Sequence, residues 1–178
     1  EQEDQARLSL AALTARGDRL AFSTDSYVID PLFFPGGNIG KLAVCGTAND
    51  VAVSGALPEY LSCGFIIEEG LEMALLERVV TSMAQTAREA GIAIVTGDTK
   101  VVPRGGVDKL FINTAGIGAI PAEIHWGAQR LAAGDVLLVS GTLGDHGAAI
   151  LNLREGLGLE GELASDCAVL TPLIQTLR

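Results

Sequence analysis

The chain has 178 residues, of which 48% are hydrophobic and 19% are charged, and its formal net charge at pH 7 is −10. This composition is too apolar for a disordered chain, and the negative charge opposes binding to the phosphate backbone of a nucleic acid. A membrane-spanning helix needs about 20 consecutive apolar residues. The longest stretch without a charged residue is Leu110–Ala122, so we expect neither a membrane segment nor a nucleic-acid partner.

The period of the apolar residues predicts the elements of the first two thirds of the chain. Helical spacing predicts a short helix before Gly17 and longer helices over Ile39–Gly55 and Leu71–Gly91. Strands are expected over Arg19–Ile29, Glu59–Glu69, Ile92–Pro103 and Leu110–Ile117. The order β-α-β-α-β-β indicates an α+β or α/β domain that is built on one sheet.

The segment Gly118–Ala122 indicates a domain boundary, because a new set of elements follows it. We expect a strand over Asp135–Ser140, a helix over Gly147–Arg154 and a further helix over Cys167–Leu177 with Pro172 in its first turn or at a kink. The predicted division is a first domain over residues 1–118 and the beginning of a second α/β domain over residues 119–178.

The three cysteines, Cys45, Cys63 and Cys167, are far apart and form no CxxC motif. An odd number without paired spacing argues against a disulfide framework or a zinc site, so we interpret them as small buried residues. The acidic N-terminal residues lack the basic and apolar regions of a signal peptide. We therefore expect the reducing environment of the cytoplasm.

Three aspartates are candidate ligands because they stand among small or hydroxyl-bearing residues. Asp25 lies near the end of a predicted strand, Asp50 lies in a helix of alanine, valine and glycine, and Asp98 follows an apolar strand. Hard oxygen ligands suit Mg²⁺, and the three carboxylates could converge on one Mg²⁺–nucleotide site. The alternative is that Asp25 and Asp98 cap turns while Asp50 faces solvent. The spacing leaves both interpretations open.

Two lysines have a similar pair of interpretations. Lys100 follows Asp98 by two residues, and it could contact a phosphate or polarise a carbonyl group, or it could be a solvated lysine. Lys41 follows Gly36 and Gly37 near the start of a helix, where an anion can bind. His146 is either a general base or an ordinary turn residue. Neither a GxGxxG nor a GxxxxGK[ST] motif is present.

Four runs of residues resemble a known family: Phe22–Ile29, Leu32–Ala43, Cys45–Asp50 and Val95–Val102. They are similar to the HypE family of hydrogenase-maturation carbamoyl dehydratases, within the aminoimidazole-ribotide synthetase (PurM-like) superfamily. The run Phe33–Gly37 together with Gly97–Val102 is specific to the HypE family in that superfamily. The resemblance covers nearly the whole chain from about Leu8.

The resemblance implies a PurM-like N-terminal ATP-binding domain that forms a homodimer through its sheets. The implied activity is the ATP-dependent dehydration of a carbamoylated C-terminal cysteine to a thiocyanate, the source of cyanide for nickel–iron hydrogenase. The implied partners are the carbamoyltransferase HypF and the HypC–HypD scaffold. By resemblance, Asp25, Asp50 and Asp98 hold Mg²⁺ and ATP, Asn49, Gly97 and Thr99 lie near the phosphates, and Lys100 handles the thiocarboxamide.

Two departures from the family pattern concern the ends of the chain. The family's Gly-rich segment is expected before Glu1, and its C-terminal cysteine and most of the second domain are expected after Arg178. We therefore expect this piece alone to be inactive. Two alternatives to the dehydratase are another ATP-dependent ligase or kinase of the superfamily, and a non-catalytic module that dimerises and docks partners.

Overall fold

The computed structural model describes residues 3–159 and 163–178. Its centre is a sheet formed by β1 (Arg19–Tyr27), β4 (Leu57–Glu68), β5 (Ala93–Val102) and β6 (Leu110–Ile120). The strand order is β1-β6-β4-β5, in which β6 is antiparallel to β1 and β4 while β4 and β5 are parallel. The central sheet is thus mixed, and the predicted α+β or α/β domain built on one sheet is confirmed. A small hairpin of β2 (Phe33–Phe34) and β3 (Gly37–Asn38) precedes the first long helix.

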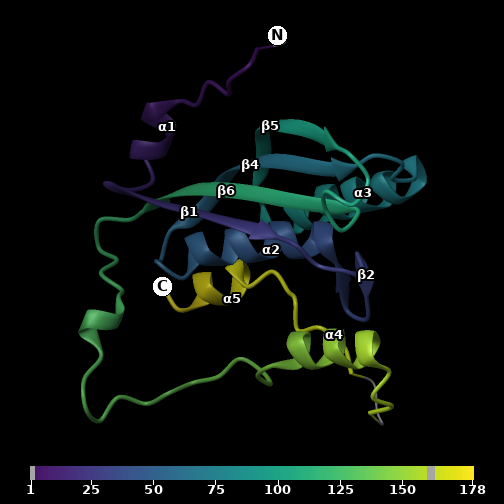
Figure 1. The fold of residues 1–178 in the computed structure, drawn as a ribbon. Coiled ribbons are helices and arrows are strands. Elements are labelled where there is room, and N and C mark those ends of the chain that lie inside the picture. The colour runs from purple at the N-terminus through teal and green to yellow at the C-terminus, as the bar shows by residue number, and fades with distance from the viewer. Residues whose placement is uncertain (1–2, 160–162) are drawn as a thin grey trace.

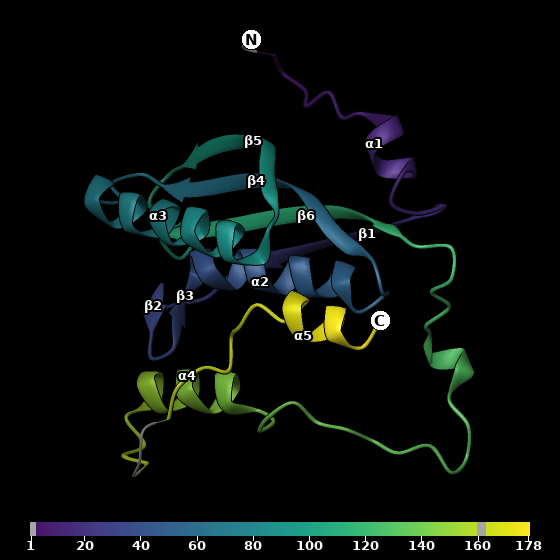
Figure 2. The ribbon, with the colours of Figure 1, turned by 180° about the vertical axis from the view of Figure 1, so that it is seen from behind.

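Two helices, α2 (Ile39–Ala52) and α3 (Met73–Ala90), cover the same face of the sheet (Figures 1 and 2). The Asn38 side chain caps the start of α2 by accepting a hydrogen bond from the Lys41 backbone N–H at 3.0 Å. Helix α3 ends at Gly91, whose φ of 67° favours glycine. These start and stop signals place both helices within a few residues of their predicted bounds.

The core lies between the sheet and these two helices. Its largest fully buried side chains include Ile39 on α2, Val79 on α3, Leu61 on β4 and Ile112 on β6. Each such side chain contributes about 1.5–3 kcal/mol when it is removed from water. The covered face of the sheet is thus complete within one chain.

The opposite face of the sheet is open, and it carries apolar side chains. Leu20 and Phe22 on β1 are 53% and 72% exposed, and Ile66 on β4 is 41% exposed. Helix α1 (Leu10–Thr14) lies only near one end of this face, as Figure 1 shows. We call the side away from α2 and α3 the open face.

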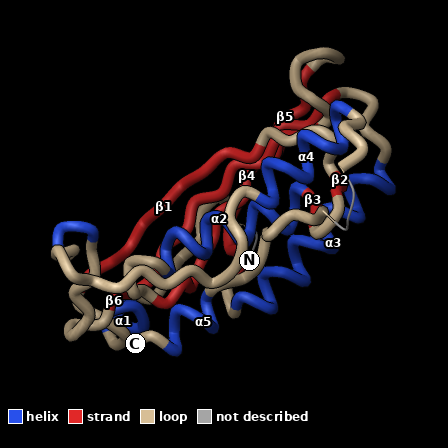
Figure 3. Tube along the Cα trace, turned by 90° about the horizontal axis from the view of Figure 1, so that it is seen from below, coloured by secondary structure: helices blue, strands red, loops and turns tan. Residues whose placement is uncertain are grey.

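The chain after β6 forms fewer contacts with the sheet. A 3-10 turn, η1 (Ala128–Arg130), is followed by α4 (Asp145–Glu155) and α5 (Thr171–Thr176). Figure 3, seen from below, shows α5 beside α2 on the side away from the strands. The prediction of a helix near Gly147–Arg154 is confirmed by α4.

Two predictions for this region are wrong. No strand forms over Asp135–Ser140, and Val136, Leu137 and Leu138 are 82%, 84% and 86% exposed. A strand needs a neighbouring backbone to bond with, and the described residues provide none for this segment. The helix expected from Cys167 begins only at Thr171, because Pro172 fits the first turn but not a helix interior.

Strand β6 continues to Ile120, beyond its predicted end at Ile117. Gly118 pairs with Ala21 of β1 and Pro58 of β4, so it belongs to this strand, and a side chain there would collide with the Leu57 carbonyl on β4. The last residues of β6 therefore lie within the range that was expected to open a second domain. No helix among residues 3–159 and 163–178 is long and apolar enough to cross a membrane.

Candidate functional site

Asp25 and Asp50 lie on the covered face of the sheet, at its β1 edge. Asp25 is opposite Thr114 in the β1–β6 ladder, and the Thr114 hydroxyl donates to the Ala43 carbonyl of α2 at 3.0 Å. Directly opposite residues of an antiparallel pair point to the same face, so Asp25 also points to the α2 side. Asp50 on α2 accepts a hydrogen bond from the Ser23 hydroxyl of β1 at 3.0 Å. Both carboxylates are exposed.

A buried chain of hydroxyl groups joins β1, α2 and β6 beneath these carboxylates. Since Thr114 donates to the Ala43 carbonyl, its oxygen accepts from Thr47 at 2.6 Å. The Thr47 oxygen in turn accepts from the Tyr27 hydroxyl at 3.0 Å. Burial is the main cause that raises the pKa of Tyr27, and the two nearby carboxylates raise it further. Tyr27 therefore remains a protonated donor that holds the β1 edge against α2.

Gly46 makes room for this hydroxyl chain. A side chain at that position would collide with the Tyr27 hydroxyl group. Tyr27, Thr47 and Thr114 were not predicted from the sequence as residues of the site. The available signal was Gly46 itself, because a glycine inside a helix costs about 0.5–1 kcal/mol relative to alanine and needs a packing reason.

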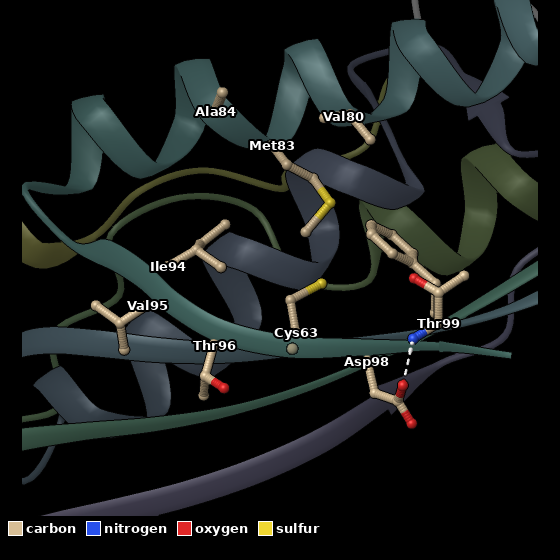
Figure 4. A pocket seen from close by; sticks show the side chains of 11 residues that line it. Cys63, Val80, Met83, Ala84, Ile94, Val95, Thr96, Asp98 and Thr99 are labelled. Carbon is tan, nitrogen blue, oxygen red and sulfur yellow. Dashed lines mark hydrogen bonds between the residues drawn. The ribbon is translucent and has the colours of Figure 1, made fainter. Parts of the chain in front are cut away.

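Asp98 and Lys100 lie on the open face of the sheet. Asp98 is aligned with Gly64 of β4, which is aligned with Asn113 of β6. Asn113 is the neighbour of Thr114 and so points away from α2. Figure 4 shows Asp98 on the side of β5 opposite to Cys63, which faces the helices.

The two side chains form an exposed ion pair. The Lys100 Nζ lies 2.7 Å from the Asp98 Oδ2, and the two side chains are 70% and 69% exposed. The hydrogen bond from Lys100 is the main cause that lowers the pKa of Asp98, followed by a bond from the Thr99 backbone N–H at 2.9 Å. Asp98 is therefore ionised at neutral pH, and Lys100 provides a positive charge beside it.

Gly97 has a structural explanation in the chain itself. A side chain at this position would collide with the Cys63 carbonyl of the neighbouring strand. Glycine is thus required for β5 to pack beside β4. The Thr99 side chain lines a cavity next to this strand, and its backbone N–H donates a hydrogen bond to the Asp98 carboxylate. A contact of either residue with a phosphate stays a prediction.

The structure does not bring Asp25, Asp50 and Asp98 together within one chain. Strands β1 and β5 are the opposite edges of the sheet, and Asp98 is on the open face whereas the other two are on the covered face. In the part of the chain that the structure describes, no three His, Cys, Asp or Glu side chains are grouped so that they could hold a metal ion. The expected convergence of the three carboxylates on one Mg²⁺–nucleotide site is therefore not found within this chain.

Asn49 is engaged within the chain instead of pointing freely toward a phosphate. Its Nδ2 donates to the Ala168 carbonyl at 2.9 Å, and its Oδ1 accepts from the Leu170 backbone N–H at 2.9 Å. These two bonds attach the segment before α5 to the surface of α2. In this arrangement the expected phosphate neighbour is a residue that holds the C-terminal segment in place.

Two other candidates from the sequence have structural roles. The Lys41 Nζ donates to the Gly36 carbonyl at 3.0 Å, so it closes the turn before α2. The His146 Nδ1 lies 2.9 Å from the Ser165 hydroxyl, and its ring packs edge-on against Phe34 with centroids 5.3 Å apart. His146 lies in the first turn of α4 and not in a loop turn, and these two contacts give it a structural role there.

A cavity of about 640 Å³ lies between α3 and the β5 edge (Figure 4). Its lining is mainly apolar and includes Met83 of α3, Cys63 of β4, and Ile94 and Thr99 of β5. Burial raises the pKa of Cys63 to about 11, so this thiol stays protonated. The cavity is within the usual size range of small-molecule sites, and Asp98 is also among the residues that line it.

Comparisons with known proteins agree with this architecture. Residues 2–120 match the family described as AIR synthase related protein, N-terminal domain. The chain is 86% identical over 178 residues to the carbamoyl dehydratase HypE of Escherichia coli K12, which covers all of this chain and 53% of that protein. A crystal structure of E. coli HypE has a TM-score of 0.97 at 84% identity, covering 99% of this chain and 55% of the other.

Two further solved structures are informative because of their bound molecules. A HypE structure in complex with ATP has a TM-score of 0.90 at 56% identity and covers 98% of this chain and 50% of the other. A HypE–HypF complex has a TM-score of 0.86 at 50% identity and covers 89% of this chain and 52% of the other.

Since the family match extends over well more than half of the residues, the chain belongs to the AIR synthase related proteins, and its sheet with α2 and α3 is their N-terminal domain. Within that family it is similar to the carbamoyl dehydratase HypE. The resemblance and the PurM-like fold predicted from the sequence are thereby confirmed. The chain spans about half the length of the curated relatives that it matches.

Proposed function

We propose that the full-length protein dehydrates a protein S-carboxamide to a protein thiocyanate at the expense of ATP, as a step in supplying cyanide ligands to nickel–iron hydrogenase. The observation that carries this proposal is the 86% identity to a carbamoyl dehydratase over every residue of the chain. The ATP bound to a 56% identical relative supports the nucleotide part of the proposal.

The reaction converts a poor leaving group into a good one. The terminal phosphoryl group of ATP is transferred to the thiocarboxamide oxygen, and that oxygen then leaves as part of inorganic phosphate. The nitrogen loses its two hydrogens as protons, and a carbon–nitrogen triple bond forms. The protein therefore loses the mass of one water molecule. Positive charge beside the transferred phosphoryl group favours the first step, and Lys100 is the residue that we assign to this role and to orienting the thiocarboxamide.

Asp25 and Asp50 are the residues that we assign to Mg²⁺ and ATP. Both are exposed carboxylates on the same face and edge of the sheet, and both act on the pKa of Tyr27. One or two carboxylates together with nucleotide phosphates are the usual ligands of Mg²⁺ in proteins, so the donor set fits this ion. When bound, Mg²⁺ would neutralise part of the phosphate charge. The hydroxyl chain beneath Asp25 and Asp50 keeps β1 and α2 in fixed relative positions.

A homodimer would complete this site. The open face carries exposed apolar residues, including Leu20 and Phe22, and burying them against a second copy would remove them from water. Two sheets that close on each other would bring the β5 edge of one chain beside the β1 edge of the other. At the rim where these two edges adjoin, Asp98 and Lys100 on the open face of one copy would complete a site with Asp25 and Asp50 at the β1 edge of the other.

The remainder of the full-length protein would complete the region after β6. We infer that residues 119–178 begin a second domain, because Val136, Leu137 and Leu138 are exposed and need a sheet to join. We therefore expect the isolated 178-residue chain to be inactive. HypF is the proposed partner because it is bound to a 50% identical relative, and the HypC–HypD scaffold is proposed as the acceptor of the nitrile. The free thiols of the described residues agree with a cytoplasmic location.

The experiment uses the full-length protein with its C-terminal cysteine carbamoylated. After addition of Mg²⁺ and ATP, intact-mass measurement should show the loss of one water per chain together with phosphate release. Lys100→Ala should keep ATP binding, measured by calorimetry, and lose the dehydration. Lys109→Ala is the matched control. Lys109 lies away from the site, where its Nζ is 2.7 Å from the Asp30 Oδ1, so this variant should dehydrate its substrate normally. Phosphate release without the mass loss would instead favour a ligase or kinase of the same family.

A further inference from the structure

Two cysteines that are distant in sequence meet between α2 and the segment before α5. The Asn49 side chain donates to the Ala168 carbonyl and accepts from the Leu170 backbone N–H, and both of these residues closely follow Cys167 in the chain. Cys45 lies one helical turn before Asn49, and residues four apart share a helix face. Cys45 and Cys167 are therefore brought to the same side of α2 by this contact, and each thiol influences the pKa of the other. Both cysteines are free thiols.

The two thiol groups have unequal environments. Cys45 is 2% exposed, whereas Cys167 is partly exposed. The pKa of Cys167 is lowered, mainly by its interaction with Cys45 and also by the positive charge of Lys41. Burial and the negative charge of Asp166 act in the opposite direction and raise it. The same interaction and burial raise the pKa of Cys45. Cys167 is thus the more accessible and the more acidic of the two thiols, and Cys45 is the protonated partner behind it.

From this geometry we propose that Cys167 is a peroxide-reactive modification site and that Cys45 resolves it to an intramolecular disulfide. The Cys167 thiolate attacks hydrogen peroxide, whose O–O bond breaks to give the sulfenic acid and a hydroxide ion. The Cys45 sulfur then attacks the Cys167 sulfur, the S–O bond breaks, and the hydroxyl group leaves as water with the Cys45 proton. The two sulfurs are oxidised and the peroxide is reduced. A partly exposed thiolate next to a second thiol is the usual arrangement of such sites.

Cys63 provides an internal comparison within the same chain. It is 6% exposed and lines the apolar cavity beside α3, and burial raises its pKa to about 11. Burial alone raises its pKa, with no contribution from a lysine or a second cysteine. Cys63 is therefore expected to stay reduced under conditions that oxidise Cys167.

The disulfide would make permanent a contact that is now reversible. Asn49 holds the segment Cys167–Leu170 on α2 by two hydrogen bonds at 2.9 Å each. Asp50 is the residue after Asn49 on α2. The bond would therefore attach the C-terminal segment covalently to the helix of the proposed nucleotide site, and a reducing agent would release it.

The test treats the 178-residue chain with hydrogen peroxide and then alkylates the remaining thiols under denaturing conditions. The expected result is a loss of two hydrogens in the intact mass, one alkylated cysteine at Cys63, and a cross-linked peptide that contains Cys45 and Cys167. Dithiothreitol should restore three alkylated cysteines. Three alkylated cysteines after peroxide, or a cross-link that involves Cys63 or a second chain, would overturn the proposal.

Two variants separate the roles of the thiols. Cys45→Ala should leave a sulfenic acid at Cys167 that dimedone captures, because the resolving thiol is gone. Cys63→Ser is the matched control, and it should form the same cross-link as the unaltered chain. At pH 7 Cys167 should also react with iodoacetamide at least about tenfold faster than Cys63, since one pKa unit changes the thiolate fraction tenfold. Equal rates for Cys167 and Cys63 in the native chain would contradict the assignment even if Cys45→Ala fails to fold.

Discussion

The two faces of the central sheet consist of alternate residues of the same strands, and they differ in what covers them. On one face, Leu61 and Ile112 are buried under α2 and α3 of the same chain. On the open face, Leu20 and Phe22 remain exposed, and Asp98 pairs with Lys100 in solvent. One face is therefore complete in a single chain, whereas the other leaves large apolar side chains exposed, as the proposed homodimer requires.

The candidate site residues on the two faces differ in the same way. Asp25 and Asp50 are attached to the covered face, where a buried hydroxyl chain holds their elements in place. Asp98 and Lys100 depend only on each other and on one backbone N–H. The proposed part of the site on the covered face is therefore held by contacts within one chain, and the proposed part on the open face would become enclosed only against a second copy.

The largest expected effect concerns the covered face. Leu61→Ala should lower the free energy of unfolding by about 2–5 kcal/mol, because it leaves a cavity in a fully buried position. Urea unfolding followed by circular dichroism measures this change. Leu20→Ala on the open face is the matched control and should change the unfolding of the isolated monomer by less than about 0.5 kcal/mol. Equal losses in the two variants would remove the distinction between the faces.

A smaller loss is expected when the buried hydroxyl chain is broken. Thr47→Val keeps the shape of the side chain but leaves the Tyr27 hydroxyl without its acceptor and Thr114 without its donor. The expected cost is about 1–3 kcal/mol in the free energy of unfolding. Thr81→Val on the exposed surface of α3 is the control. A Thr47→Val variant as stable as its control would show that the chain does not hold the β1 edge against α2.

The open face should control association more than the stability of the monomer. Phe22→Glu places a charge on the exposed apolar surface of β1, where it would be desolvated between two copies. Sedimentation velocity at micromolar concentration should show a dimer for the unaltered chain and a monomer for Phe22→Glu, with nearly the same urea midpoint at low protein concentration. Val53→Glu, at an exposed position near the end of α2, should remain dimeric. A Phe22→Glu dimer would place the interface elsewhere.

The smallest effect is the pH dependence that arises from Asp98. The pKa of this carboxyl is lowered in the folded chain, chiefly by Lys100. Its contribution to stability is therefore present above the unfolded pKa of about 3.9 and is lost as the pH falls through the folded pKa. A carbon-detected NMR titration should show this low pKa, and Lys100→Ala should move it toward the ordinary aspartate value. An unchanged Asp98 titration in Lys100→Ala would mean that the ion pair does not form.

Local sequence patterns were sufficient for most of the sheet and its helices. The period of apolar residues and the caps at Asn38 and Gly91 depend on neighbours in the chain, so they can be read without a fold. The segment Asp135–Ser140 has the same apolar character as a strand but forms none, because pairing depends on a partner backbone elsewhere. Composition alone cannot show that partner.

The candidate site was harder to predict for a similar reason. Alternation along β5 places Asp98 and Lys100 on the same face, but only the register with Gly64 and Asn113 shows that this face is the open one. The hydroxyl chain joins Tyr27, Thr47 and Thr114, which are 20 and 67 residues apart along the chain. Such contacts follow from the topology and have no signature in sequence spacing.

In the proposed homodimer, one nucleotide site takes Asp50 from one chain and Asp98 from the other. The most direct measurement mixes two full-length variants, Asp50→Asn and Asp98→Asn, each inactive alone, after dissociation and reassociation of the dimers. Half of the dimers are then mixed, and each has one intact site, so about a quarter of the unaltered dehydration activity should return if the site is shared between symmetric copies. No recovery, with mixed dimers demonstrated by mass, would contradict a shared site.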